Sequence, residues 1–403
     1  MSQWFETAKA RATEAASTPL RRDAIERLAL TRWPTRKTEA WKYTSLYPLN
    51  DVDYPLATGG TRENHLLIPN LEATYIRFDG KEWHVEGELP EGVSLSSAQL
   101  DSRIKPNHHL FGNINDALAD QRLNLQVAAG ATVSQPIVLS IAALEHQEQH
   151  AAATVTIGDG AELTLIEMAT GEGEGVTTQF AEYLVGEGAT FNHYRFALQH
   201  VPHFFFGGTH IRLEEKSTLN SFVMGFGAQL SRLDIDIDHA GSYANANMDC
   251  IYLLRDKEHF DLHTTIEHSV AHGTSEENVR VIAADQAKAT FNGRIHIHRD
   301  AQKTLAEMNN RNLLLSRNAE INTKPELEIY ADDVKCAHGA TVAEMDEKSL
   351  YYLVSRGIPR KQAEIMLNFG FINELVDKID DDTIATWIRE QLVAKFDLMT
   401  GAL

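Results

Sequence analysis

Alternating hydrophobic and polar positions dominate the chain between about residue 120 and residue 310. Segments such as LTLIEMA (163–169) and TFNHYRFAL (190–198) alternate in this way and end in turn residues, which is typical of half-buried β-strands. The period of a helix disappears over the same stretch. We therefore expect this region to consist of many short strands.

A Gly-Ala-x-apolar motif recurs through this region. It reads GATV at 130, GAEL at 160 and GATF at 188, with weaker copies KSTL at 216 and GSYA at 241. The spacings of 30, 28, 28 and 25 residues match one coil of a parallel β-helix, in which each turn of strands stacks on the last. A β-sandwich also has many short strands, so the repeat favours the solenoid. We predict a mainly β fold with a right-handed parallel β-helix core over 120–344.

Helical patterns flank this core on both sides. Residues 1 to about 33 predict two helices, with Thr18 as an N-cap and Pro19 at the first helical position of the second. The predicted organisation is an N-terminal helical region (1–60), a connecting segment (61–119), the β-helix (120–344) and a C-terminal helical domain (345–403).

The C-terminal domain carries its own helix signals. Asp346 can cap a helix that Gly357 ends, Pro359 opens the next helix, and a further helix covers about 383–398. The helix–glycine–helix pattern superficially resembles a helix-turn-helix. Its second helix is poor in basic residues, however, so docking of a protein partner is the better interpretation.

Composition excludes several classes of function. The net charge of −20 disfavours general binding to nucleic acid. Cys250 and Cys336 are the two cysteines and form no CxxC, which indicates a reducing, cytosolic setting. The N-terminus has no apolar signal region, and no apolar run approaches 18 residues, so we expect neither export nor a membrane span. Phosphate-loop, dinucleotide-binding, GxSxG and HExxH motifs are missing from the sequence, which favours a scaffold or half of a shared site.

Cys336 and His338 are the leading candidates for chemistry. In a strand, positions i and i+2 point to the same face, so the thiol and the imidazole would project side by side. Both are metal ligands, but a buried metal ion normally needs four ligands. The pair is therefore either incidental packing or a site that a partner chain completes. A Cys–His hydrolase pair is disfavoured, since no third orienting residue is in view.

Two other groups of residues are weaker candidates. LDIDIDH (233–239) places Asp234, Asp236 and Asp238 on one face of a strand, which suggests either a solvated face or the carboxylates of a carbohydrate-active β-helix enzyme. The second group is a run of histidines in which the pair His296/His298 could hold a metal but lacks further ligands at a recognisable spacing, so surface or stacked histidines are favoured. The run comprises His259, His263, His268, His272, His296 and His298.

A family resemblance rests on longer motifs. NTKPELEIYADDVKCAHGAT (322–341), followed by LYYLVSRGI and FGFINELVD, closely resembles the C-terminal signature of the SufB/SufD family of iron–sulfur assembly proteins. PTRKTEAWKYT (34–44) resembles the N-terminal signature of its SufD-type members. SufB-type members are longer and typically carry an N-terminal cysteine motif. This chain has no cysteine before residue 250, so it is similar to the SufD type over about residue 20 to the end.

The resemblance implies a non-catalytic scaffold subunit with defined partners. It implies pairing with SufB through the β-helices, docking of the SufC ATPase on the C-terminal helices, and sulfur supply from SufS with SufE or SufU. It places His338 opposite a SufB cysteine, with Cys336 as its neighbour, at a transient iron–sulfur cluster. A reduced flavin is associated with the family's complex, although no residue here identifies a flavin site. A homodimer of the chain, and a Cys/His metal-binding module acting alone, are the other interpretations.

The segment that matches the SufC-docking region of the family spans Asp346–Arg356 and continues past Pro359. The expected docking residues are Leu350, Tyr351, Leu353, Val354, Arg356, Gly357, Ile358 and Pro359.

Overall fold

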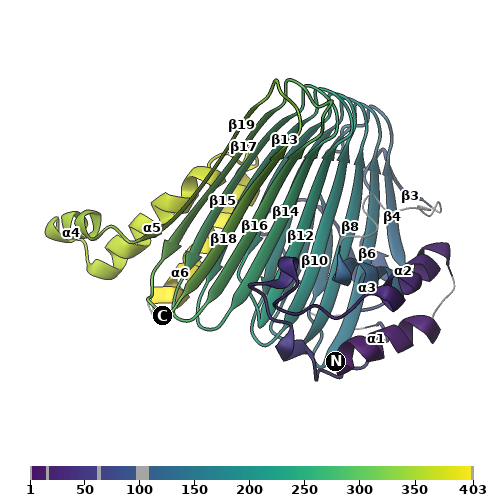
Figure 1. Ribbon diagram of the computed structural model, residues 1–403, viewed down its shortest axis with the longest axis horizontal. Helices are drawn as coiled ribbons and strands as arrows, with labels where there is room; N and C mark the ends of the chain where they lie inside the picture. The colour runs from purple at the N-terminus through teal and green to yellow at the C-terminus, as the bar shows by residue number, and fades with distance from the viewer. Residues whose placement is uncertain (1, 15–17, 61–64, 97–108, 401–403) are drawn as a thin grey trace.

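The computed structural model describes residues 2–14, 18–60, 65–96 and 109–400. Its strands form two sheets, and consecutive strands along the solenoid alternate between them (Figure 1). Neighbouring strands within each sheet are parallel from β4 and β5 onward, giving a solenoid of about eight turns. The predicted mainly β fold, a parallel β-helix between helical ends, is confirmed.

The first sheet carries most of the odd-numbered strands. In spatial order it contains β19 (Lys335–Glu344), β17 (Leu305–Leu314), β15 (Thr274–Ala283), β13 (Asn245–Leu254), β11 (Thr218–Gly225), β9 (Thr190–Gln199), β7 (Glu162–Gly171), β5 (Ile137–Ala142), β1 (Thr74–Phe78) and β2 (Trp83–Val85).

The second sheet carries most of the even-numbered strands. Its order is β18 (Glu320–Ile329), β16 (Lys288–Ile297), β14 (His259–His268), β12 (Leu230–His239), β10 (Phe204–Leu213), β8 (Gly175–Val185), β6 (Gln147–Ile157), β4 (Arg122–Val127) and β3 (Val93–Leu95).

The repeated motif marks one stacked row of turns between the sheets. Gly130, Gly160 and Gly188 have φ values of 70°, 65° and 65°, a left-handed backbone that glycine adopts without steric cost. The N–H of Gly160 donates to Glu187 O of the next turn at 2.7 Å. Later turns use Lys216 and Tyr243 at φ 57° and 63°, so the motif fades while the backbone geometry persists.

Three apolar clusters hold the described part of the chain together. The largest fills the space between the two sheets and includes Leu233, Ile235 and Ile237. The second packs C-terminal helices α5 (Arg360–Val376) and α6 (Asp382–Thr400) on the outer face of the first sheet, where the Phe196 and Trp387 rings lie 4.9 Å apart.

The third cluster covers the outer face of the second sheet with the N-terminal helices (Figure 1). These are α1 (Gln3–Glu14), α2 (Pro19–Leu30) and α3 (Leu110–Leu118), with 3₁₀ turns at Glu39–Trp41 and Tyr47–Leu49. The Phe111 ring of α3 stacks on Phe206 of β10 at 3.5 Å.

Several local predictions are confirmed by the helix ends. The Thr18 side chain accepts from the Arg21 N–H with Pro19 in the first turn, and Asp346 caps α4 (Glu347–Ser355) by accepting from the N–H groups of Lys348 and Ser349. Gly357, at φ 86°, ends α4. Among the described residues, none of the helices has both the length and the apolar character needed to cross a membrane.

Candidate functional site

The solenoid ends in two strands whose outer edges are unpaired. Within the described part of the chain, β19 pairs only with β17, and β18 pairs only with β16. Each strand is ten residues long, and almost all of β19 is exposed. Long exposed edges present unpaired N–H and C=O groups, which are a template for pairing with another chain. We call this end, with its two unpaired strand edges, the open end (β18 and β19).

The backbone of β19 turns alternate residues toward that edge. Lys335 N–H donates to Thr304 O at 2.9 Å, on the β17 side. Because parallel ladders use alternate residues for each neighbour, the N–H groups of Cys336, His338 and Ala340 face the unpaired edge. The candidate thiol and imidazole thus sit on residues whose backbone is available to the same partner strand.

Cys336 and His338 also share one face of β19. They lie in register with Ala306 and Met308 of β17, both buried in the cluster between the sheets. Paired residues in neighbouring strands point to the same side, so both candidates face the interior at the point where the stack stops. Cys336 is half-buried against the cluster, and His338 is exposed. Burial raises the pKa of the Cys336 thiol, which disfavours the thiolate in the isolated chain.

Several polar side chains lie in the interior next to Cys336 and His338. Asn312 Nδ2 donates to Asn310 Oδ1 at 2.5 Å and to Thr341 O of β19 at 2.8 Å. Thr323 Oγ1 of β18 donates to the same Asn310 oxygen at 2.7 Å, which links the two sheets. One strand further in, Glu277 lies in register with Met308, and burial raises its pKa to about 7. Polar side chains thus line part of the interior below the open end, beside the apolar cluster that Cys336 packs against.

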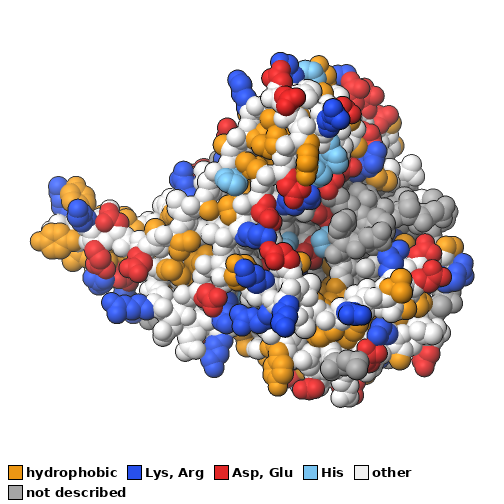
Figure 2. Space-filling view, viewed as in Figure 1, with side chains coloured by type: hydrophobic (Ala, Val, Ile, Leu, Met, Phe, Trp, Pro, Cys, Tyr) orange, Lys and Arg blue, Asp and Glu red, His pale blue; other side chains and the backbone are white. Residues whose placement is uncertain are grey.

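The C-terminal helices form a projection on the same side of the molecule as the open end (Figure 1). α4 and the first half of α5 extend away from the solenoid, and hydrophobic side chains gather at their tip (Figures 1 and 2). Tyr351 is 75% exposed, Tyr352 57% and Val354 39%. Leu350 is only 1% exposed, so it holds the projection together and offers no surface of its own. The remaining predicted docking residues are the half-buried Leu353 and Ile358 and the exposed Arg356, Gly357 and Pro359.

The aspartate ladder, formed by Asp234, Asp236 and Asp238 of β12, differs from the solvated face that was expected. Asp234 and Asp236 are each 4% exposed beneath the N-terminal region, while Leu233, Ile235 and Ile237 face the core as predicted. Arg232 contacts Asp234 at 2.9 Å, and His109 contacts Asp236 at 2.6 Å.

These ion pairs determine the chemistry of the ladder. Burial disfavours the charged His109 ring, but Asp234 and Asp236 outweigh it and raise the pKa of His109 to about 10. The carboxylates neutralise buried cations instead of facing a substrate, which counts against the carbohydrate-active enzyme. The solvated-face interpretation fails for Asp234 and Asp236 because a segment far away in the sequence covers them. Asp238 is less buried and accepts a hydrogen bond from Ser269 Oγ at 2.8 Å.

The histidine run divides into packed and clustered residues. His268 stacks on His239 at 4.2 Å, and His272 stacks on Tyr243 at 4.5 Å. His263 contacts Asp261 at 2.9 Å, and His259 is half-buried. His296 and His298 lie together, as expected of i and i+2, and Glu267 of β14 joins them. Glu267 could not be predicted from the sequence, because only the strand register brings it beside His296.

Comparison with known proteins places this architecture in a family. The family model for the "SUF system FeS cluster assembly, SufBD core domain" matches residues 140–371. The chain belongs to this SufBD core family.

Relatives of the SufBD core family extend the similarity over most of the chain. The iron–sulfur cluster assembly protein SufD of Escherichia coli (strain K12) is 28% identical, over 98% of this chain and 95% of its own. Protein ABCI7, chloroplastic, of Arabidopsis thaliana is 26% identical, over 94% and 87%. A SufBD family protein of Synechocystis is 26% identical, over 89% and 86%. The predicted resemblance to SufD is confirmed, and with it a role in iron–sulfur cluster assembly in the SUF system.

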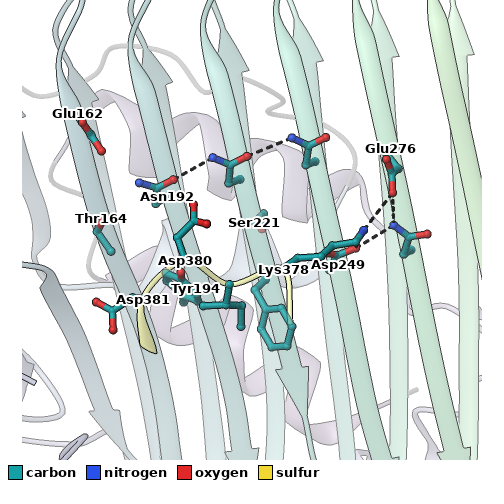
Figure 3. A pocket seen from close by; sticks show the side chains of 15 residues that line it. Glu162, Thr164, Asn192, Tyr194, Ser221, Asp249, Glu276, Lys378, Asp380 and Asp381 are labelled. Carbon is teal, nitrogen blue, oxygen red and sulfur yellow. Dashed lines mark hydrogen bonds and ion pairs between the residues drawn. The ribbon is translucent and has the colours of Figure 1, made fainter. Parts of the chain in front are cut away.

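A polar groove lies where this SufBD chain joins its C-terminal helices. It has a volume of about 580 Å³ and runs across the first sheet beside the α5–α6 connection (Figure 3). Asn192, Asn220 and Asn247 form a ladder of side-chain hydrogen bonds of 3.0 and 3.1 Å along it. Lys378 contacts Asp249 at 3.3 Å and Glu276 at 3.1 Å. The groove residues thus tie the C-terminal helices to the solenoid.

Proposed function

We propose that the chain is a SufD-type scaffold subunit whose open end pairs with the β-helix of SufB. The observation that carries the proposal is the position of Cys336 and His338 on the inner face of an unpaired terminal strand. A second solenoid added at this edge would continue both sheets by β-strand pairing. It would also cover the exposed side chains Ile329 (43%), Tyr330 (63%) and Val342 (46%).

The proposed pairing completes an incomplete site. Cys336 and His338 supply up to two ligands, and the SufB chain would supply the others at the covered interface. The nascent iron–sulfur cluster is the cargo of this site, and His338 is the firmer ligand because its side chain is exposed whereas Cys336 is half-buried. Burial keeps the Cys336 thiol protonated, so a metal ion or a nearby cation has to stabilise its thiolate.

The C-terminal projection is the proposed docking surface for the SufC ATPase. Its exposed surface is supplied by Tyr351, Tyr352 and Val354, and aromatic residues are typical centres of protein interfaces. ATP hydrolysis resides in SufC in this proposal, and the chain itself is non-catalytic. Dimerisation of two SufC subunits would move the projections, and the ion pairs of Lys378 would pass that motion to the sheets.

The wider assembly follows the family resemblance. Sulfur arrives from SufS with SufE or SufU, a reduced flavin belongs to the complex rather than to the isolated chain, and the complex works in the reducing cytoplasm. A homodimer through the same open end is the competing assembly.

Pairing at the edge of β19 is tested by one backbone change. Ala340→Pro removes an N–H that faces the unpaired edge, whereas Ala340→Val keeps it. We expect co-purification of the chain with SufB and SufC to fail for Ala340→Pro and to succeed for Ala340→Val. Equal recovery of SufB with both variants would refute edge pairing, provided that both variants melt at the temperature of the unsubstituted chain.

A further inference from the structure

Three ligating side chains meet on the outer face of the second sheet, away from the open-end pair. Glu267 of β14 and His296 of β16 are in register, and His298 follows two residues later. Ile266, Ile295 and Ile297 face the core, so the alternation of the strands turns the three ligating residues outward. One ligand atom from each residue lies within 4.8 Å of the others, and Glu267 Oε2 is 3.6 Å from His298 Nε2.

We infer that Glu267, His296 and His298 form a binding site for one divalent transition-metal ion. Two imidazoles and one carboxylate suit Zn²⁺, Fe²⁺ or Co²⁺, and water would fill the open coordination positions. The proposal does not rest on the SufB-shared site, because that site lies on the inner face of a different strand.

The surroundings of the two rings favour ligation. The His296 and His298 rings lie 4.2 Å apart, and the Tyr330 ring packs edge-on against His296 at 5.4 Å, which limits rotation of that ring. His298 Nε2 is shielded from solvent and makes no hydrogen bond with any described residue.

The neighbouring guanidinium of Arg294 limits the affinity of the proposed site for a metal ion. Arg294 Nη1 lies 3.9 Å from Glu267 Oε1 and would repel a bound metal ion. Its guanidinium is held mainly by Glu328, through hydrogen bonds of 2.9 and 2.6 Å. Removal of that charge by Arg294→Gln should therefore tighten metal binding several-fold.

The test is an anaerobic titration of the untagged full chain with Co²⁺, read by visible absorption, followed by competition with Fe²⁺ and Zn²⁺. We expect one Co²⁺ per chain. His296→Ala and His298→Ala should each weaken binding at least tenfold, and Glu267→Gln should also weaken it. The matched control His272→Ala removes an exposed histidine elsewhere and should leave binding unchanged.

Three results would overturn the proposal. The first is the absence of stoichiometric binding to the unsubstituted chain, and the second is full binding by the His296→Ala/His298→Ala double variant. The third is loss of binding in His338→Ala alone, which would place the metal at the open end. His296 and His298 are only half-buried, so we expect their replacement to leave the fold intact. Unchanged melting temperatures would establish that each variant is folded.

Discussion

His338 lies directly opposite Met308 in the paired strands β19 and β17, so its imidazole faces the interior of a solenoid that stops at that strand. A core position has thus become an exposed one, because no further described strand stacks above it. The same row continues inward to Glu277. The strand register therefore places the buried Glu277, the core residue Met308 and the candidate ligand His338 in one row, which ends at the unpaired edge.

Alkylation of the native chain should separate the two cysteines. Cys250 is fully buried, and Cys336 is half-buried, so iodoacetamide should modify Cys336 first. Since burial raises the pKa of Cys336, its reaction at pH 7 should be slower than that of a free cysteine and should accelerate as the pH rises. Mass spectrometry of the digested chain measures both rates. Addition of SufB should protect Cys336, and unchanged labelling in the presence of bound SufB would contradict the proposed interface.

Truncation of one tyrosine on the projection should weaken docking of SufC. Tyr351 is 75% exposed, so Tyr351→Ala removes contact area without disturbing the fold, and a central interface tyrosine is worth about 1–3 kcal/mol. We expect a roughly tenfold or larger rise in the Kd for SufC, measured by calorimetry. Tyr47→Ala, at 74% exposure in the N-terminal region, is the matched control and should have no effect. Equal Kd values for both variants would rule out this docking surface.

Glu277 should make stability depend on pH. Burial raises its folded-state pKa to about 7, above the value of an unfolded glutamate, so the folded chain retains a proton that the unfolded chain loses. This protonated state contributes fully below about pH 4.5, and the contribution is lost as the pH rises to 7. Glu277→Gln should therefore raise the free energy of unfolding by about 3 kcal/mol at pH 8, and by much less at pH 4.5. Urea denaturation at the two pH values measures the difference, and a gain that is independent of pH would contradict the assignment.

The aspartate ladder should prove structural. Asp234→Asn leaves the buried guanidinium of Arg232 with less compensation, at a cost of about 3–5 kcal/mol in the free energy of unfolding. Asp238→Asn, at a more accessible position, should cost about 0.5 kcal/mol or less. Chemical denaturation distinguishes the two variants. Similar costs for both variants would contradict the structural role of the buried ion pair between Asp234 and Arg232.

The repeat and the helix caps could be predicted because they are local. A left-handed turn residue favours glycine, which makes Gly130, Gly160 and Gly188 visible in the sequence. The later turns at Lys216 and Tyr243 have the same geometry without that signal. Strand β1 and helix α3 were missed within the segment expected to be a connection. Almost every residue of α3 is buried, so it lacks the polar face that marks a surface helix.

The side-chain clusters of the second sheet were harder to predict. They depend on the register between strands and on which distant segment covers the sheet. Glu267 and His296 are 29 residues apart, and only the pairing of β14 with β16 brings them together. Asp236 looked solvated because its cover, His109, comes from a distant segment. Cys336 and His338 were found because i and i+2 on one strand need no long-range information.

His338 is proposed to act at a site that a partner chain completes. The measurement is the initial rate of cluster formation in the anaerobically reconstituted complex with SufB and SufC, comparing His338→Ala with the exposed-histidine control His272→Ala. We predict at least a tenfold loss of rate for His338→Ala, with the complex intact by gel filtration and the melting temperature of the chain unchanged, and no loss for the control. A His338→Ala complex that builds clusters at the normal rate would contradict the account.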